Sequence, residues 1–253
     1  MMPESVLLLL ALATYLAAGI LFYRDCENRL NRFVLLLAVG LHLLALVVRS
    51  WIAQHPPFTN MYETFVLLPF LIALRLLLWR RQVSTKYIWL VILFVVILLG
   101  IALLLPPSMK EPRPLMPALN SLWMYIHVPA YFFGYMAMSL AFLYALIIVF
   151  KARGKNDEEL VRRMDTEVRI AFFFLNLGLV TGAIWAYISW GNYWGWDPKE
   201  TWALINILIL AYYFHLRKTT IRRRAIVIIL SFLSIIFTYW GVSFILAGLH
   251  SYT

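Results

Sequence analysis

The sequence predicts an all-α, polytopic membrane protein with about eight transmembrane helices and both termini on the extracytoplasmic side. Of its 253 residues, 63% are hydrophobic and only 13% are charged, whereas soluble domains contain about 25% charged residues. Long apolar segments recur along the whole chain, each close to the roughly 20 residues that a membrane-spanning helix requires. This composition excludes an ordinary soluble domain, a disordered chain and a disulfide-rich scaffold.

Eight apolar segments are expected to cross the membrane. They are residues 4–23, 33–53, 62–79, 87–105, 121–150, 167–189, 200–216 and 225–247. The longest polar stretch, residues 151–167, is too short to form a separate soluble domain. Residues 1–253 are therefore expected to form a single transmembrane domain.

Lys and Arg are concentrated in the loops that follow the first, third, fifth and seventh segments. Cytoplasmic loops carry an excess of these residues, so these four loops are predicted to lie inside and the alternate loops outside. An even number of spans then places both termini outside. Because topology accounts for the net charge of +10, membrane lipid is the expected surrounding and no nucleic acid is expected as a partner.

Residues 190–202, which we name the tryptophan segment, are predicted to form an extracytoplasmic loop. The segment contains Trp190, Trp194, Trp196 and Trp202. Aromatic belts place single Trp side chains at membrane interfaces, but four in so short a segment favour a platform for a large, flat, apolar ligand.

Two polar motifs are predicted to begin helices at the outer face. Asp197 stands at an N-cap position with Pro198 and Glu200 at the first and third helical positions, which is the pattern of a capping box. Asn60 and Glu63 repeat this spacing. Capping is favoured over catalysis for Asp197, and the free N–H groups of such helix starts attract anions.

Four histidines occupy informative positions. His127 and His250 are predicted to lie outside, on either side of the tryptophan segment, whereas His42 and His215 lie in or near the inner half of the membrane. Ionisable residues inside a membrane are rare and usually functional, although a neutral imidazole bonded to a backbone carbonyl is the alternative for each. His55 is expected to be a loop residue without a ligand role.

The aromatic segment, the paired histidines and the helix starts together indicate heme as the ligand. A closed zinc site requires four ligands, commonly with Cys, and a quinone does not require two histidines. Heme is broad, flat and apolar, its iron takes axial His ligands, and its anionic propionates could meet Lys199, Arg113 or helix N-termini.

The motif from Trp190 to Trp202, Trp-Gly-Asn-Tyr-Trp-Gly-Trp-Asp-Pro-Lys-Glu-Thr-Trp, resembles the tryptophan-rich (WWD) signature of the heme-handling proteins of cytochrome c biogenesis. That superfamily includes CcsA/ResC, CcmC, CcmF and HemX. The motifs Asn60–Glu63, Trp123–Val128 and Gly248–Tyr252 resemble further marks of the CcsA/ResC type. The CcmC relatives typically have six spans, so eight spans favour CcsA/ResC.

This resemblance implies roles for individual residues. It implies that His127 and His250 are the axial ligands of the iron of an external heme b, and that His42 and His215 belong to a transmembrane heme site. It also implies that an external heme platform is formed by Trp190, Trp194, Trp196, Asp197 and Trp202. No catalytic residue is indicated.

The function implied by the resemblance is the transport and presentation of heme and its covalent attachment to the Cys-x-x-Cys-His motif of apocytochrome c. The protein would then be a subunit of a holocytochrome c synthase, a heme lyase, together with a CcsB/ResB-type membrane partner. Its location would be the bacterial cytoplasmic membrane or a plastid thylakoid membrane, with the heme site facing the extracytoplasmic side. The alternatives are a HemX-like heme-binding regulator or delivery protein without synthase activity, and a transporter of another aromatic ligand.

Overall fold

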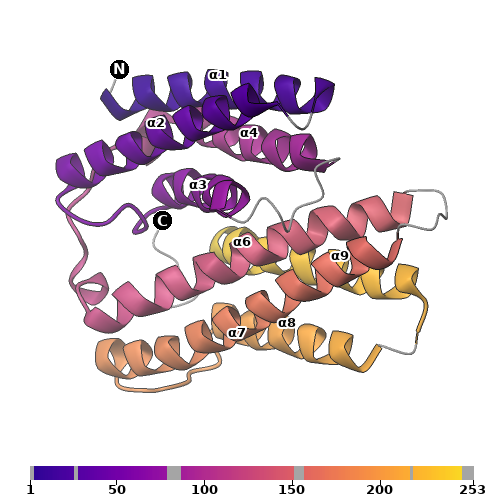
Figure 1. Ribbon diagram of the computed structural model, residues 1–253. Coiled ribbons are helices and arrows are strands. Elements are labelled where there is room, and N and C mark those ends of the chain that lie inside the picture. The colour runs from indigo at the N-terminus through magenta and orange to yellow at the C-terminus, as the bar shows by residue number, and fades with distance from the viewer. Residues whose placement is uncertain (1–2, 26–27, 79–86, 151–156, 217–218, 247–253) are drawn as a thin grey trace. The chain divides into compact units, whose positions relative to one another are not determined.

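The computed structural model describes residues 3–25, 28–78, 87–150, 157–216 and 219–246, and these are mainly helical. No β-strand occurs within these ranges. The chain divides into two compact units, Met1–Leu119 and Asn120–Thr253, whose helices are coloured from indigo to yellow in Figure 1. The predicted all-α, polytopic fold is confirmed.

The first unit contains four long helices. They are α1 (Pro3–Arg24), α2 (Arg29–Ala53), α3 (Met61–Leu78) and α4 (Ile88–Leu104), followed by the short α5 (Pro107–Lys110) and a 3-10 turn at Pro117–Leu119. Helix α2 begins where the side chain of Asn28 accepts a hydrogen bond from the Leu30 N–H, and it ends at Gln54, whose φ of 59° is left-handed. Both features are standard ways of closing helix ends.

Helix α1 shows how this unit is held together. Its buried residues, among them Leu8, Ala11, Tyr15 and Ala18, recur every three or four positions and so form one face. This helix packs against α2 and α4, and α3 packs against α4. Ala11 and Ala18 are completely buried, and small residues of this kind let membrane helices approach closely.

The second unit contains four more long helices. They are α6 (Leu122–Phe150), α7 (Asp157–Trp190), α8 (Pro198–His215) and α9 (Ile221–Ile236), and α9 continues into a π-helical turn (Phe237–Gly241) and α10 (Val242–Ile245). Helix α6 packs along α7 and α9, and α8 packs against α7 and α9. Hydrogen bonds from Tyr213 and Arg224 to Asp165 join the end of α8 and the start of α9 to the start of α7.

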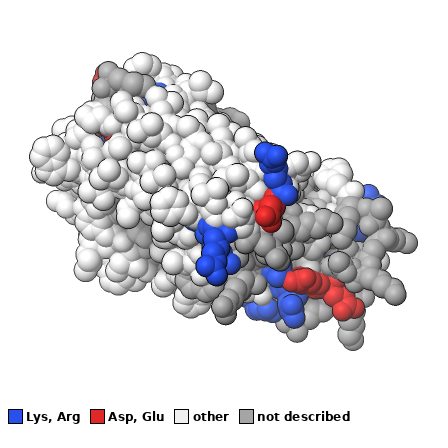
Figure 2. Space-filling view, turned by 45° about the horizontal axis from the view of Figure 1, so that its top comes forward, with Lys and Arg blue, Asp and Glu red and all other residues white. Residues whose placement is uncertain are grey.

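The described surface matches a lipid environment. Among the described residues, six helices are long and apolar enough to cross a membrane, and α4 is a shorter apolar helix of 17 residues. Helix α8 does not belong to these six; its first turn contains Lys199 and Glu200, and Asn206 lies further along it. Large apolar side chains such as Ile20 and Leu104 are exposed, and Figure 2 shows a face on which charged side chains are few. Hydrocarbon chains would cover such a surface.

Each of the eight predicted spans corresponds to one long helix, but three helix starts differ from the prediction by four residues or more, the first being that of α2, which begins at Arg29 and not at residue 33. Helix α7 begins at Asp157, ten residues before the predicted start at residue 167. The additional residues are polar, and Arg163 pairs with Glu159 one turn earlier, a spacing that stabilises helices. The last span, predicted as 225–247, begins at Ile221 because Thr220 caps the helix there. From Ile236 the helix continues through the π-helical turn and α10 to Ile245, close to the predicted end at residue 247.

Candidate functional site

His127 lies in the second turn of α6 and is held against α7. Its Nδ1 donates a hydrogen bond to the carbonyl oxygen of Gly178 at 2.8 Å. Its ring stacks on that of Trp185, with centroids 5.7 Å apart and planes 23° from parallel. A neutral imidazole that donates from Nδ1 carries its lone pair on Nε2, so Nε2 is the nitrogen that can coordinate iron.

The tryptophan segment is a loop only over residues 191–197, because Trp190 is the last residue of α7 and Trp202 lies in α8. Trp190 packs edge-on against Trp185 at 4.9 Å, which connects the segment to the surroundings of His127. Trp202 packs on Phe237, the first residue of the π-helical turn, at 4.5 Å.

The loop presents aromatic rings at the surface. Trp196 has a left-handed φ of 56°, its side chain is 68% exposed, and its ring meets that of Trp194 edge to face at 5.7 Å. Tyr193 stacks on Tyr187 with the ring planes only 7° from parallel, and both side chains are exposed. An apolar, aromatic ligand could lie against this surface.

Asp197 and Glu200 form the predicted capping box at the start of α8. The carboxylate of Asp197 accepts from the Lys199 N–H at 2.9 Å. The carboxylate of Glu200 accepts from the N–H groups of Gly195 and Asp197. Asp197 is buried, and its carboxylate caps the start of α8.

The remaining predicted ligands are placed differently. His250 lies outside the described residues, so its pairing with His127 stays a prediction. His42 is completely buried in α2, where Nε2 donates to the carbonyl of Val66 at 3.0 Å and Nδ1 lies 3.4 Å from the hydroxyl of Tyr15. Both of its nitrogens are therefore engaged within the first unit.

His215 is exposed near the end of α8. Its Nδ1 donates to the carbonyl of Ala211, one turn earlier in the same helix. His42 belongs to the first unit and His215 to the second, so their predicted joint heme site stays a prediction.

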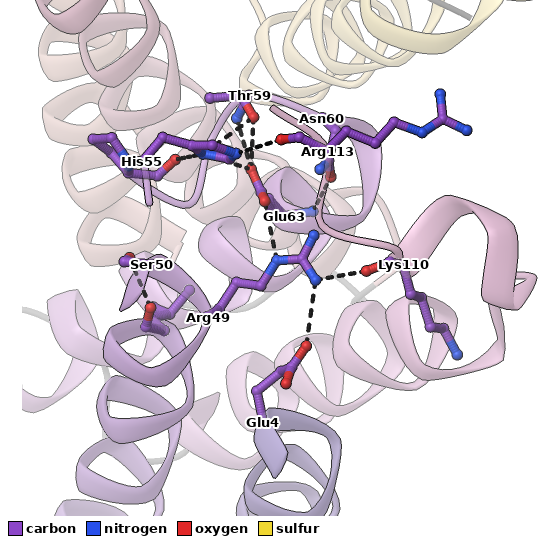
Figure 3. A network of polar contacts seen from close by, with 11 residues as sticks. Glu4, Arg49, Ser50, His55, Thr59, Asn60, Glu63, Lys110 and Arg113 are labelled. Carbon is purple, nitrogen blue, oxygen red and sulfur yellow. Dashed lines mark hydrogen bonds and ion pairs between the residues drawn. The ribbon is translucent and has the colours of Figure 1, made fainter. Parts of the chain in front are cut away.

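Figure 3 shows a buried polar cluster in the first unit that the sequence analysis did not identify. Arg49 of α2 forms ion pairs with Glu4 of α1 at 3.3 Å and with Glu63 of α3 at 3.0 Å, and it also donates to the Lys110 carbonyl. The side chains of Arg49, Glu4 and Glu63 are at most 3% exposed. The cluster thus ties the ends of α1, α2, α3 and α5 together.

His55 joins two loops to this cluster, although it was expected to be a simple loop residue. Its Nε2 donates to the carbonyl of Arg113 at 3.1 Å, and its Nδ1 lies 4.0 Å from the carboxylate of Glu63. The same oxygen of Glu63, Oε2, accepts from the N–H and the hydroxyl of Thr59, while the side chain of Asn60 caps the Glu63 N–H. The start of α3 is thus closed by its own side chains.

These features define an α-helical, polytopic membrane protein with a fixed histidine on α6 and an exposed aromatic loop between α7 and α8. The family described as Cytochrome C assembly protein matches residues 3–250, and the chain belongs to this family.

Two curated relatives are each named cytochrome c biogenesis protein CcsA. The protein from Mesostigma viride is 32% identical over 247 residues, which cover 83% of this chain and 81% of the relative. The protein from Prochlorococcus marinus (strain MIT 9301) is 31% identical over 258 residues, covering 87% and 84%. The chain therefore spans most of the length of these relatives.

A solved structure, named cytochrome c heme lyase CcmF, has the same fold. Its TM-score is 0.68 at 19% sequence identity, and the alignment covers 92% of this chain but only 46% of that one. The chain thus corresponds to less than half of the heme lyase, and the likeness concerns the fold.

Proposed function

We propose that this protein binds heme at its extracytoplasmic face and presents it for covalent attachment to apocytochrome c. The observation that carries the proposal is the arrangement of His127, whose Nδ1 bonds to the Gly178 carbonyl and whose ring stacks on Trp185; we assign its Nε2 as the nitrogen that binds the iron. Membership of the cytochrome c assembly family supports it, as do relatives named for cytochrome c biogenesis and a fold shared with a heme lyase.

The described residues fit a heme. His127 supplies a neutral imidazole, and the exposed rings of Trp196, Tyr187 and Tyr193 supply apolar surface for a flat macrocycle. We assign His250 as the second axial ligand. Trp190, Trp194 and Trp202 complete the proposed platform, in which Asp197 acts by fixing the start of α8.

The proposed reaction joins heme b to the two thiols of a Cys-x-x-Cys-His motif. Each thiol adds across one vinyl group of the heme, so a carbon–sulfur bond forms, the thiol proton passes to the other vinyl carbon, and no net oxidation occurs. The protein contributes by holding the substrates close together and correctly oriented. Since the motif histidine becomes an iron ligand in the product, either His127 or His250 must give up its place.

Further proposals concern the route and the partner. We assign His42 and His215 to a transmembrane heme site, which requires His42 to give up its contact with Tyr15 or Val66. A membrane partner of the CcsB/ResB type completes the synthase in the bacterial cytoplasmic membrane or in the thylakoid. The heme site then faces the extracytoplasmic side.

The absorption spectrum of the detergent-purified full chain tests this proposal. We expect heme to copurify with the wild type, and His127→Ala or His250→Ala to lower heme occupancy and change ligation, with added imidazole restoring the six-coordinate spectrum. A double variant with the wild-type heme spectrum would exclude both histidines as ligands. Coexpression with the partner and an apocytochrome then separates synthase activity from HemX-like binding, in which heme copurifies but no holocytochrome forms.

A further inference from the structure

The imidazole of His127 lies directly against the backbone of α7. A Cβ atom added at Gly182 would stand 2.5 Å from both Cε1 and Nδ1 of the His127 ring, which is far inside van der Waals contact. No residue larger than glycine can therefore occupy position 182 while His127 keeps its position. The close approach, and not backbone conformation, is what requires glycine here.

Three more contacts hold the same ring from other directions. The Gly178 carbonyl accepts from Nδ1 at 2.8 Å, the indole of Trp185 stacks on one face, and the ring of Tyr131 meets the imidazole edge-on at 5.0 Å. Trp185 is itself 2% exposed, so it offers a rigid surface. Gly178, Gly182 and Trp185 follow one another at helical spacing on α7, and we name them the imidazole contact face.

We propose that the imidazole contact face of α7 is a positioning element that sets the tautomer and the ring plane of His127 for binding iron. The inference deepens the proposed function and rests on His127 being an axial ligand. Residues that bind the second nitrogen of a ligating histidine fix its orientation and raise the basicity of the ligating nitrogen. Gly178 does this through its carbonyl group, whereas Gly182 and Trp185 act through shape.

The same pair of helices contains a matched control. A Cβ atom added at Gly134 of α6 would stand 2.7 Å from a methyl carbon of Leu175 on α7. Gly134→Ala therefore disturbs the packing of α6 on α7 without a methyl group next to the imidazole. Comparing Gly182→Ala with Gly134→Ala separates an effect on the imidazole of His127 from an effect on the packing of α6 on α7.

The experiment uses the full chain purified in detergent with the heme acquired during expression. We expect Gly182→Ala to lower heme affinity by about 10–100-fold, as removal of contacts to a metal ligand generally does, and to shift the spectrum away from that of the wild type. Added imidazole should restore the six-coordinate spectrum. Gly134→Ala should lower the thermal midpoint of unfolding while retaining the wild-type heme spectrum.

Trp185 provides a second pair of variants in case Gly182→Ala fails to fold. Trp185→Phe preserves an aromatic face for the imidazole and should retain the wild-type spectrum and reduction potential, whereas Trp185→Leu should change both. If Gly182→Ala and Trp185→Leu lower only the thermal midpoint, the contact face serves packing alone and this inference is wrong. If His127→Ala also retains the wild-type heme spectrum, the proposed function itself fails, which distinguishes the two outcomes.

Discussion

Arg49 shows how a single buried charge organises one end of the first unit. Its guanidinium lies between Glu4 and Glu63 and over the ring of Tyr62 at 5.2 Å. Glu63 uses both carboxylate oxygens, one for Arg49 and one for Thr59. The second oxygen of Glu4 has no hydrogen-bond partner among the described residues. The two carboxylates therefore contribute unequally to the cluster.

Arg49→Met is expected to destabilise the protein by about 3–5 kcal/mol, because it leaves two buried carboxylates without their cation. Glu4→Gln is expected to cost about 1 kcal/mol, since the amide oxygen can still accept from Arg49 and Glu63 keeps its ion pair. Unfolding in mixed detergent micelles, followed by tryptophan fluorescence, measures both. If Arg49→Met and Glu4→Gln lowered the free energy of unfolding equally, Glu4 would contribute as much to the cluster as Arg49, and the unequal contribution of the two carboxylates would be wrong.

At the scale of elements, the start of α8 decides how the aromatic loop is presented. Glu200 reaches back to two N–H groups of the loop, and Asp197 covers the first turn. These contacts give both acidic residues of the motif a role in holding the loop and the first turn of α8. The charge of Asp197 and its capacity to cap can be tested separately, because Asn caps helices as well as Asp does.

Asp197→Asn is expected to retain heme binding and stability, whereas Asp197→Ala should destabilise α8 by about 1 kcal/mol and lower heme occupancy through the displaced loop. The heme spectrum and the thermal midpoint of both purified variants provide the measurement. If Asp197→Asn loses heme as completely as Asp197→Ala does, the carboxylate has a role at the heme beyond capping.

The elements were predictable because each depends on local sequence. Apolar length located all eight long helices, and the spacing of Asp197 and Glu200 predicted a cap that the structure confirms. The start of α7 was missed because hydropathy does not detect a charged helical turn. The contacts of His127 were also missed. Gly178, Gly182 and Trp185 lie in an apolar span, and their contact with the imidazole depends on how α6 packs on α7.

At the scale of the whole molecule, charge and apolar surface point to the same arrangement. In the first unit the start of α1, the end of α2 and the start of α3 meet at Arg49. In the second unit His127 near the start of α6 meets Gly178 in the last part of α7, and Asp165 in the first part of α7 meets the end of α8 and the start of α9. Consecutive helices in these two sets therefore run in opposite directions. Such alternation sends successive loops to opposite sides of a membrane. The distribution of Lys and Arg then predicts which side is cytoplasmic.

Labelling of single cysteines tests this predicted orientation in a Cys26→Ser background. Asn192→Cys lies in the exposed aromatic loop and Glu158→Cys at the exposed start of α7, which are predicted to be outside and inside respectively. A membrane-impermeant maleimide should label the first in intact spheroplasts and the second only after permeabilisation. The opposite pattern would place the aromatic loop and His127 on the cytoplasmic side, where the proposed presentation of heme to an extracytoplasmic apocytochrome could not take place.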